Sequence, residues 1–235
     1  MNKKCPANEL LSIHQRYERR KGDKNQSRYN YLDPSVYMSQ QEKERCLIRW
    51  IQQAGLEPLN EKRLLEIGCG SGVNLMQFLR FGFKAENLMG NELLEERAEK
   101  ARRLLPAEIQ IQVCDANIMA LPEDLFDVVY QSTVFSSILD QGFQKKLADK
   151  MWSLVKPGGG VLWYDFIFDN PKNSDVKGVP VSRILKLFPC GKFKVWKLTL
   201  APPISRMVTK IHPSMYSVLN IFPILRTHVL CWIQK

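Results

Sequence analysis

The chain has 235 residues, of which 45% are hydrophobic and 25% are charged, a composition ordinary for a globular protein with a buried core. It excludes an intrinsically disordered chain, a fibrous repeat and a small disulfide scaffold. The six cysteines form no CxxC pair, so we expect reduced thiols and no metal site. Because the sequence shows neither an apolar signal segment nor a stretch of about 18 apolar residues, it predicts a cytoplasmic protein.

The net charge of +10 is unevenly distributed along the chain. Residues 64–165 contain 10 basic and 14 acidic side chains, whereas residues 166–235 contain 11 basic and only 2 acidic ones. A basic C-terminal third favours an anionic partner, such as a phosphorylated substrate, a membrane surface or a nucleic acid. A solvated basic surface with no partner is the alternative.

Helical patterns occupy the first 60 residues. Residues 8–20 form a polar helical pattern, and residues 19–27 are typical of an exposed loop. Asp33 and Pro34 match the N-cap and first position of a second helix, in which apolar residues keep helical spacing as far as Gly55.

After residue 60, strands and helices alternate. Short apolar runs predict strands at residues 64–67, 87–90, 109–113, 126–130 and 161–164, separated by helices at 73–82, 93–105 and 143–155 and by a turn at 156–159. This alternation predicts an α/β protein with a doubly wound parallel sheet. The C-terminal third departs from the rhythm, with a short helix at 182–188, strands at 193–200 and 226–233, and a basic, apolar stretch between those strands.

A glycine-rich turn at residues 68–72 follows the first of these strands and precedes a helix. Glycines there allow close approach of a ligand to the backbone, and the helix start offers free N–H groups, so the turn indicates a nucleotide site. The spacing departs from the dinucleotide fingerprint, because Val73 stands where the last glycine belongs. Glu66 would also repel a pyrophosphate and would suit a cationic ligand end. We therefore do not expect NAD.

Residues 64–72 resemble the first motif of class I S-adenosylmethionine-dependent methyltransferases, and residues 90–92, 114–116, 121–129 and 154–159 resemble further segments of that family in order. The resemblance covers about residues 60–166. It implies a Rossmann-like sheet of about seven strands, mostly parallel with an antiparallel last strand, with helices on both faces. It also implies S-adenosylmethionine as cofactor and S-adenosylhomocysteine as product. The cofactor-binding residues that it implies are Glu66, Gly68, Cys69, Gly70, Gly72, Asn74, Glu92, Leu93, Asp115, Ala116 and Gln131.

Catalytic residues are harder to assign. Many small-molecule methyltransferases of this type have a histidine shortly after strand four, where this chain has Ser136 and Ser137. Asp165 ends strand five, at the edge of the sheet where ligands bind, and is the first candidate for a general base. His228, in the final strand, is the second candidate.

In this family the N-terminal segment and insertions near the last strands usually set acceptor specificity. We therefore expect residues 1–60 to form a helical cap on the substrate side, and residues 61–235 to form the methyltransferase domain with a basic, apolar insertion at about 168–224. Candidate acceptor contacts are Tyr29, Tyr164, Arg206 and His212. Residues 204–211 suit a lid or an interface with lipid, which would make the protein peripheral to a membrane. Packing as an ordinary cap helix is the alternative and the more common outcome for such a stretch.

The acceptor itself is the least determined part of the prediction. Residues 169–171 and 226–228 resemble methyltransferases of bacterial surface-polysaccharide pathways. We therefore expect methyl transfer to a hydroxyl of a small or glycan-linked acceptor, anionic or lipid-linked. The alternatives are a quinone-like or polyketide-like molecule, RNA, and a non-catalytic partner protein. The sequence shows no basic-aromatic recognition module, which disfavours nucleic acid. It does not indicate an oligomeric state.

Overall fold

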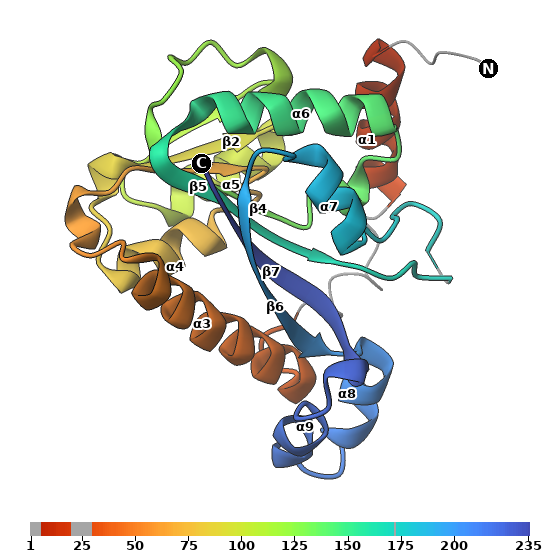
Figure 1. Ribbon diagram of the computed structural model, residues 1–235. Helices are drawn as coiled ribbons and strands as arrows, with labels where there is room; N and C mark the ends of the chain where they lie inside the picture. Colours follow the sequence, from red (N-terminus) through yellow and green to blue (C-terminus); the bar gives the residue numbers. More distant parts are fainter. Residues whose placement is uncertain (1–5, 20–29, 172) are drawn as a thin grey trace.

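Figure 1 shows the computed structural model, which describes residues 6–19, 30–171 and 173–235. Tyr29 and all of the predicted loop at 19–27 except Arg19 lie outside the described residues. Within the described part, seven strands form one sheet in the order β3-β2-β1-β4-β5-β7-β6. Their bounds are β1 Leu64–Ile67, β2 Leu88–Glu92, β3 Gln110–Val113, β4 Phe126–Ser132, β5 Val155–Phe166, β6 Lys192–Leu200 and β7 Arg226–Gln234.

Strand β7 runs antiparallel to both of its neighbours, and the paired strands from β3 to β5 are parallel. This confirms the predicted fold class, a mostly parallel Rossmann-like sheet with an antiparallel last strand. The carboxyl ends of the parallel strands meet at one edge of such a sheet, which is where ligands bind. The glycine turn, the end of β2 and Asp165 all lie at this edge.

Helices cover both faces of the sheet (Figure 1). One core cluster packs α3 (Pro34–Ala54), α4 (Val73–Phe81) and α5 (Glu95–Leu104) against one face. The other packs α1 (Pro6–Arg19), α6 (Gln141–Leu154) and α7 (Val181–Leu187) against the opposite face. The remaining helices are α8 (Pro202–Val208) and α9 (Ser214–Leu219), with 3-10 turns at Leu59–Glu61, Ala85–Asn87, Ala116–Ile118, Phe135–Ser137 and Pro223–Leu225.

Local chemistry explains the limits of α3. The Asp33 carboxylate accepts a hydrogen bond from the Ser35 backbone N–H at 2.8 Å, and Pro34 occupies the first turn. Gly55 ends the helix at a φ of 63°, a left-handed conformation that glycine adopts at little cost. The predicted helix between Asp33 and Gly55 is therefore confirmed at both ends.

The turn predicted at 156–159 is wrong, because these residues belong to β5. Phe126 pairs with Val155 and Val128 with Gly160, so a bulge absorbs the extra residues. The C-terminus supplies the partners that keep this segment in the sheet: the Lys235 N–H donates to the Gly159 carbonyl at 2.9 Å, and the Gly158 N–H donates to the Lys235 carbonyl at 3.3 Å. A local pattern does not show partners so distant in sequence.

Helices α8 and α9 lie between β6 and β7 and project beyond the sheet at the bottom of Figure 1. They fall within the basic insertion expected at about 168–224. Because β6 pairs with β7 as β5 does, β6 and β5 run in the same direction, and the projection leaves the sheet at its carboxyl edge. Among the described helices, none has the length and apolar character needed to cross a bilayer.

Candidate active site

The glycine turn joins β1 to α4 in a conformation that requires glycine at several positions. Gly68, Gly70 and Gly72 have φ angles of 65°, 59° and 84°. A Cβ atom on Gly68 would lie 2.5 Å from the Val134 side chain, and one on Gly72 would lie 2.6 Å from Leu105. The turn thus exposes backbone N–H groups at a helix N-terminus, which is a favourable place for a nucleotide ligand.

Glu92 ends β2 beside this turn and is only 4% exposed. One carboxylate oxygen accepts the Gly70 N–H at 2.8 Å, and the other accepts the N–H groups of Leu93 and Leu94 at 2.9 and 3.1 Å. Arg97 Nε lies 3.9 Å from the same carboxylate. A carboxylate has about four lone-pair positions, and these three N–H groups occupy three of them, so Glu92 keeps the capacity for about one further hydrogen bond from a ligand hydroxyl.

A cavity of about 70 Å³ opens between the carboxyl ends of the strands and helix α1. Five of the residues implied as cofactor contacts line it, namely Gly68, Glu92, Leu93, Asp115 and Ala116. The wall opposite them comes from Leu10, Ile13 and Tyr17 of α1, and Val134, Ser137 and Ile138 complete the lining from the segment after β4. A shallower hollow of about 520 Å³ adjoins it at Asp115 and Phe143.

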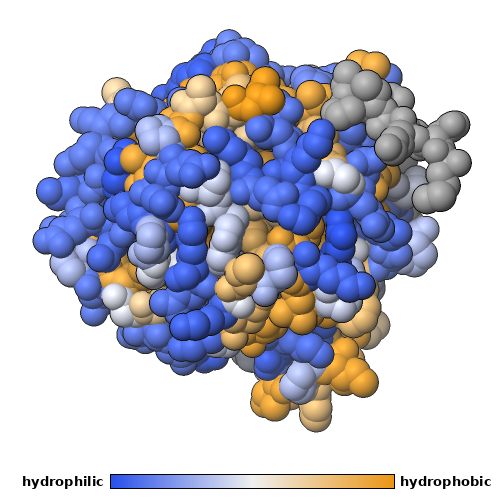
Figure 2. Space-filling view, turned by 45° about the horizontal axis from the view of Figure 1, so that its top comes forward, coloured by the Kyte–Doolittle hydropathy of each residue, from blue (hydrophilic) through white to orange (hydrophobic). Residues whose placement is uncertain are grey.

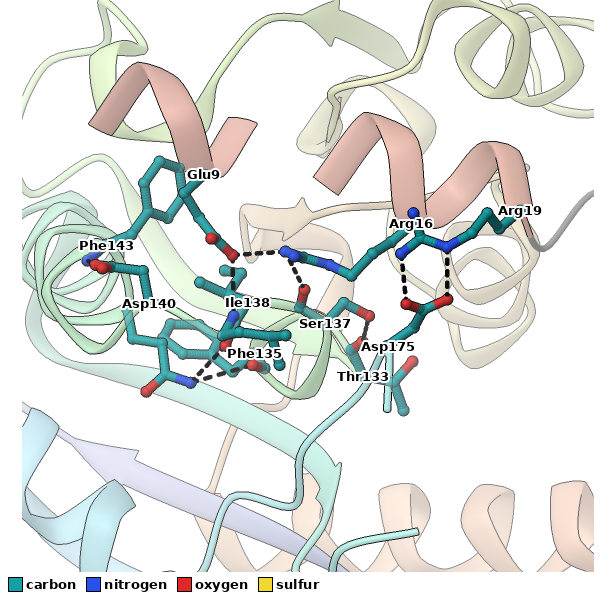
Figure 3. A network of polar contacts seen from close by, with 12 residues as sticks. Glu9, Arg16, Arg19, Thr133, Phe135, Ser137, Ile138, Asp140, Phe143 and Asp175 are labelled. Carbon is teal, nitrogen blue, oxygen red and sulfur yellow. Dashed lines mark hydrogen bonds and ion pairs between the residues drawn. The ribbon is translucent and has the colours of Figure 1, made fainter. Parts of the chain in front are cut away.

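Polar contacts fasten α1 over the cavity (Figure 3). Arg16 Nη2 pairs with Glu9 Oε1 at 2.5 Å and donates to the Ser137 carbonyl at 3.1 Å. Glu9 also accepts the Leu139 N–H at 2.9 Å. At the end of the helix, Arg19 pairs with Asp175 at 2.5 Å. Helix α1 is therefore joined both to the segment after β4 and to the segment after β5.

The comparisons with known proteins agree with this geometry. Residues 64–159 match the model of a family described as "Methyltransferase domain". Residues 64–159 therefore carry a methyltransferase domain, and the chain has the fold of S-adenosylmethionine-dependent methyltransferases. No curated protein matches the chain in sequence.

Solved structures show how widely this fold is used. An S-adenosylmethionine-dependent methyltransferase from Mesorhizobium loti is 17% identical with a TM-score of 0.57, over 78% of this chain and 95% of that one. A putative sarcosine dimethylglycine methyltransferase from Galdieria sulphuraria is 12% identical with a TM-score of 0.60, over 82% and 85% of the two chains. The [4+2]-cyclase SpnF is also 12% identical, with a TM-score of 0.58, over 82% and 81%. At these identities the likeness shows the fold alone.

The residues around the methyltransferase cavity fit S-adenosylmethionine, the cofactor of this family. Glu92 would accept hydrogen bonds from the ribose hydroxyls, and Asp115 would face the adenine amine, as the resemblance implies. Asp115 holds its own turn through Asn117, whose backbone N–H it accepts at 3.0 Å. Cys69 ties the glycine turn to β2 by donating its backbone N–H to the Asn91 carbonyl at 2.9 Å.

Asp165 lies at the carboxyl end of β5 and is fully buried. Its carboxylate accepts the backbone N–H of Ser136 at 3.1 Å and that of Phe166 at 2.9 Å. Burial raises the pKa of Asp165 to about 7, the direction expected from its apolar neighbours, although these hydrogen bonds oppose the shift. Ser137, one residue beyond the Ser136 donor, lines the cavity, so Asp165 lies directly behind the cavity wall.

His228, the second candidate base, lies opposite Phe166 in the pairing of β5 with β7. Its ring stacks on Tyr164 with centroids 5.3 Å apart, and its Nδ1 is 3.0 Å from Thr227 Oγ1. Burial, together with the charge of Lys43, lowers the pKa of His228 to about 4. A general base works best when its pKa is near the working pH, so Asp165 is the better matched of the two.

Glu66 and Asn74 face helix α3, on the other side of β1 from Ile67 and the cavity. Asn74 Nδ2 donates to Glu66 Oε1 at 2.6 Å, and Asn74 Oδ1 accepts from Lys43 Nζ at 2.8 Å. The amide thus bridges a buried carboxyl and a buried ammonium group. Burial raises the pKa of Glu66 and lowers that of Lys43, and the opposite charge of each moderates both shifts.

Lys43 is a buried charged residue near the candidate site that sequence reasoning missed. Its ammonium group also lies 4.7 Å from the centre of the Tyr164 ring and 3.4 Å from Ser132 Oγ, at the ends of β5 and β4. A signal was present, because Lys43 precedes Cys46, Leu47 and Trp50 at helical spacing on the buried stripe of α3. A lysine in such a stripe requires a buried partner.

The other predicted residues are spread over two regions. Gln131 supports the segment after β4, because its Oε1 accepts the Val134 N–H at 3.0 Å. The Tyr164 hydroxyl is hydrogen-bonded to Thr199 Oγ1 at 3.0 Å, under α3. Arg206 and His212 are exposed on the projection formed by α8 and α9, and His212 Nδ1 accepts the Ser214 N–H at 3.2 Å.

Proposed function

We propose that the protein transfers a methyl group from S-adenosylmethionine to a hydroxyl of a small or glycan-linked acceptor, with a phosphorylated or lipid-linked sugar preferred. The observation that carries the proposal is Asp165, a buried carboxyl at the carboxyl end of β5 whose pKa is raised to about 7. A hydroxyl is a weak nucleophile unless a base accepts its proton, whereas an amine attacks from its neutral form.

When bound, the cofactor supplies an electrophilic methyl group. The chain must then align the acceptor, exclude water and remove one proton. Helix α1 and the segment after β4 line the cavity, and they would limit the access of water once the ligands are bound. As the acceptor oxygen gains the methyl group, its proton would pass to the carboxylate of Asp165, which the N–H groups of Ser136 and Phe166 hold in position. Because Asp165 is buried behind the cavity wall, the acceptor must displace part of that wall to reach it.

The charge distribution supports an anionic acceptor. Between residues 176 and 235 the sequence contains ten Lys and Arg residues and no Asp or Glu. This segment enters the sheet as β6 and β7, next to the strand that carries Asp165. A positive field at the acceptor side raises the local concentration of phosphorylated substrates. A quinone-like or polyketide-like acceptor is the second candidate, favoured by the aromatic rings of Tyr164 and Phe166, which both contact His228 near the end of β5.

The test is a transfer assay with methyl-labelled S-adenosylmethionine and four acceptor classes: nucleotide sugars, glycolipid extracts, quinones and RNA. We expect label in a sugar, as an alkali-stable ether. Label in a quinone alone would support the second candidate. Label in RNA, or transfer only to amines, would overturn the proposal. Glu92→Ala serves as the control that separates genuine transfer from labelled contaminants.

A further inference from the structure

Helices α8 and α9 and the turn after them, residues 202–225, form a projection that we call the tip. Its inner side has a small core of its own, in which Val208 and Tyr216 are buried together with Leu200. Its outer side is also apolar. The side chains there are between 54% and 86% exposed, and they are Met207, Ile211, Ile221, Phe222 and Ile224. Figure 2 shows hydrophobic residues gathered at the lower edge of the molecule, where Figure 1 places these helices.

Such an outer surface costs free energy in water and contributes nothing to the packing of this chain. Scattered apolar residues are normal on protein surfaces, but here they share one projecting element. The tip therefore presents a surface suited to an apolar or amphipathic partner.

Cations flank the apolar residues, with no acidic side chain among them. Arg206 and Lys210 belong to the tip, and both are exposed. Lys194 and Lys197 follow on β6, the edge strand of the sheet. Residues 176–235 contain no Asp or Glu. From outside this segment, Asp33 partly offsets Arg206, since hydrogen bonds from Ser35 and, more weakly, the charge of Arg206 lower the pKa of Asp33. Apolar side chains at a protruding end, with cations around them, match the two layers of an anionic bilayer, acyl chains below and phosphate groups above.

The tip is held firmly in one orientation. Glu42 of α3 accepts hydrogen bonds from Tyr216 Oη at 2.6 Å and from Asn220 Nδ2 at 2.5 Å, and it also accepts the Thr199 N–H at 2.9 Å. Arg226 Nε donates to the Asn220 carbonyl at 2.8 Å. These contacts join the tip to α3 and to both of its flanking strands, so the apolar side cannot fold back onto the chain.

We propose that the tip docks onto an anionic lipid bilayer, with Ile211, Phe222 and Ile224 in the interfacial layer and Arg206 and Lys210 against lipid phosphates. The docked tip presents the carboxyl edge of the sheet, and with it Asp165, to the membrane. The proposal concerns binding alone and does not rest on methyl transfer or on the identity of the acceptor.

The test is sedimentation of the full chain with vesicles of phosphatidylcholine, with and without about one third phosphatidylglycerol. We expect binding to the anionic vesicles and little to the neutral ones. Ile211→Ser, Phe222→Ser and Ile224→Ser combined should lower the partition coefficient by at least about tenfold, because they remove the inserted surface. Arg206→Gln with Lys210→Gln should lower it by about fivefold for each charge. Binding should also weaken as salt rises.

The matched control is Leu104→Ser with Leu185→Ser, which removes exposed apolar side chains elsewhere and should leave binding unchanged. Retained affinity for S-adenosylhomocysteine shows that each variant is folded. Absence of sedimentation, or equal binding by the tip variant and its control, overturns the proposal. A tip that mediates self-association instead would show as a concentration-dependent dimer in solution, lost in the triple variant, without vesicle binding, and this too overturns it.

Discussion

The segment that matches the family, residues 64–159, and the segment that follows it are built in opposite ways. In the first, the ligand-facing groups are largely backbone atoms, held by glycines in left-handed conformations and by one carboxylate, Glu92. In the second, the distinguishing groups are side chains: ten basic residues and no acidic one between residues 176 and 235, and an outward apolar tip. A backbone site leaves a short, fixed sequence pattern, whereas a side-chain surface does not. The cofactor can therefore be named from this sequence while the acceptor cannot.

Asp165 lies at the junction of these two segments, and its replacement tests whether chemistry occurs there. We expect Asp165→Asn to slow turnover by about 10²–10⁴-fold, the usual contribution of a general base, with cofactor affinity nearly unchanged. Turnover of the native protein should rise with pH up to about 7, where Asp165 becomes ionised, and the variant should lose this rise.

His228→Gln is the control for that experiment. If it slows turnover more than Asp165→Asn does, the base comes from the C-terminal segment instead. Near-normal turnover in both variants would mean that alignment alone suffices.

Lys43→Met tests whether the two segments share a structural support in α3. We expect the unfolding free energy to fall by about 3–5 kcal/mol, because Glu66 would remain buried without its counter-charge. Adding Glu66→Gln should restore most of the loss. Arg49→Met, at an exposed position of the same helix, is the matched control. Denaturant unfolding measures all four proteins, and a loss below about 1 kcal/mol in the single variant would contradict the role of the pair.

Glu92→Ala tests the segment that matches the family by itself. Loss of a charged acceptor for ribose hydroxyls should weaken S-adenosylhomocysteine binding about ten- to a hundredfold. Glu99→Ala, at an exposed position of α5, should have no effect. Calorimetry measures the affinity of each variant for S-adenosylhomocysteine. An unchanged affinity of the Glu92 variant would show that Glu92 does not bind the cofactor.

The pKa shifts of the two candidate bases should change the unfolding free energy with pH in opposite directions. The pKa of Asp165 in the folded protein is raised to about 7. Its contribution to folding stability is therefore complete at acid pH and is lost as pH rises from about 4 to 7. The pKa of His228 is lowered to about 4, so folding displaces its proton and stability increases as pH rises from about 4 to 6.5.

These opposing slopes should nearly cancel in the native protein between pH 4 and 6.5. In Asp165→Asn only the shift of His228 remains, so we expect the unfolding free energy to increase with pH. In His228→Gln only the shift of Asp165 remains, so we expect it to decrease. Each slope should be at most about 1.4 kcal/mol per pH unit. Unfolding free energies measured at several pH values would show this. Parallel slopes in the two variants would contradict the assigned shifts.

Sequence patterns predicted the elements whose stability is local. The first strand, residues 64–67, coincides with β1, and the cap at Asp33 and the end at Gly55 are as expected. The early start of β5 was missed because its partner is Lys235, at the other end of the chain. The direction of the Asp165 pKa shift follows from its place in an apolar strand, but the Ser136 N–H that fixes its carboxylate depends on tertiary structure.

The same limit applies to the candidate site. Local geometry dictates the spacing of the glycines in the turn and of the acid at the end of β2. Five of the implied cofactor residues do line one cavity. The bridge from Lys43 through Asn74 to Glu66 joins three elements, and the contact of Arg16 with Ser137 joins residues far apart in the chain. Only packing brings these groups together.

The position of α1 has a consequence for the kinetics. The cavity beneath it has a volume of about 70 Å³, below the roughly 300 Å³ typical of small-molecule sites, so we expect α1 to move outward when the cofactor binds. Each outward movement breaks the contacts of Arg16 with Ser137 and of Glu9 with Leu139. We expect the opening rate of this helix to set an upper limit on turnover.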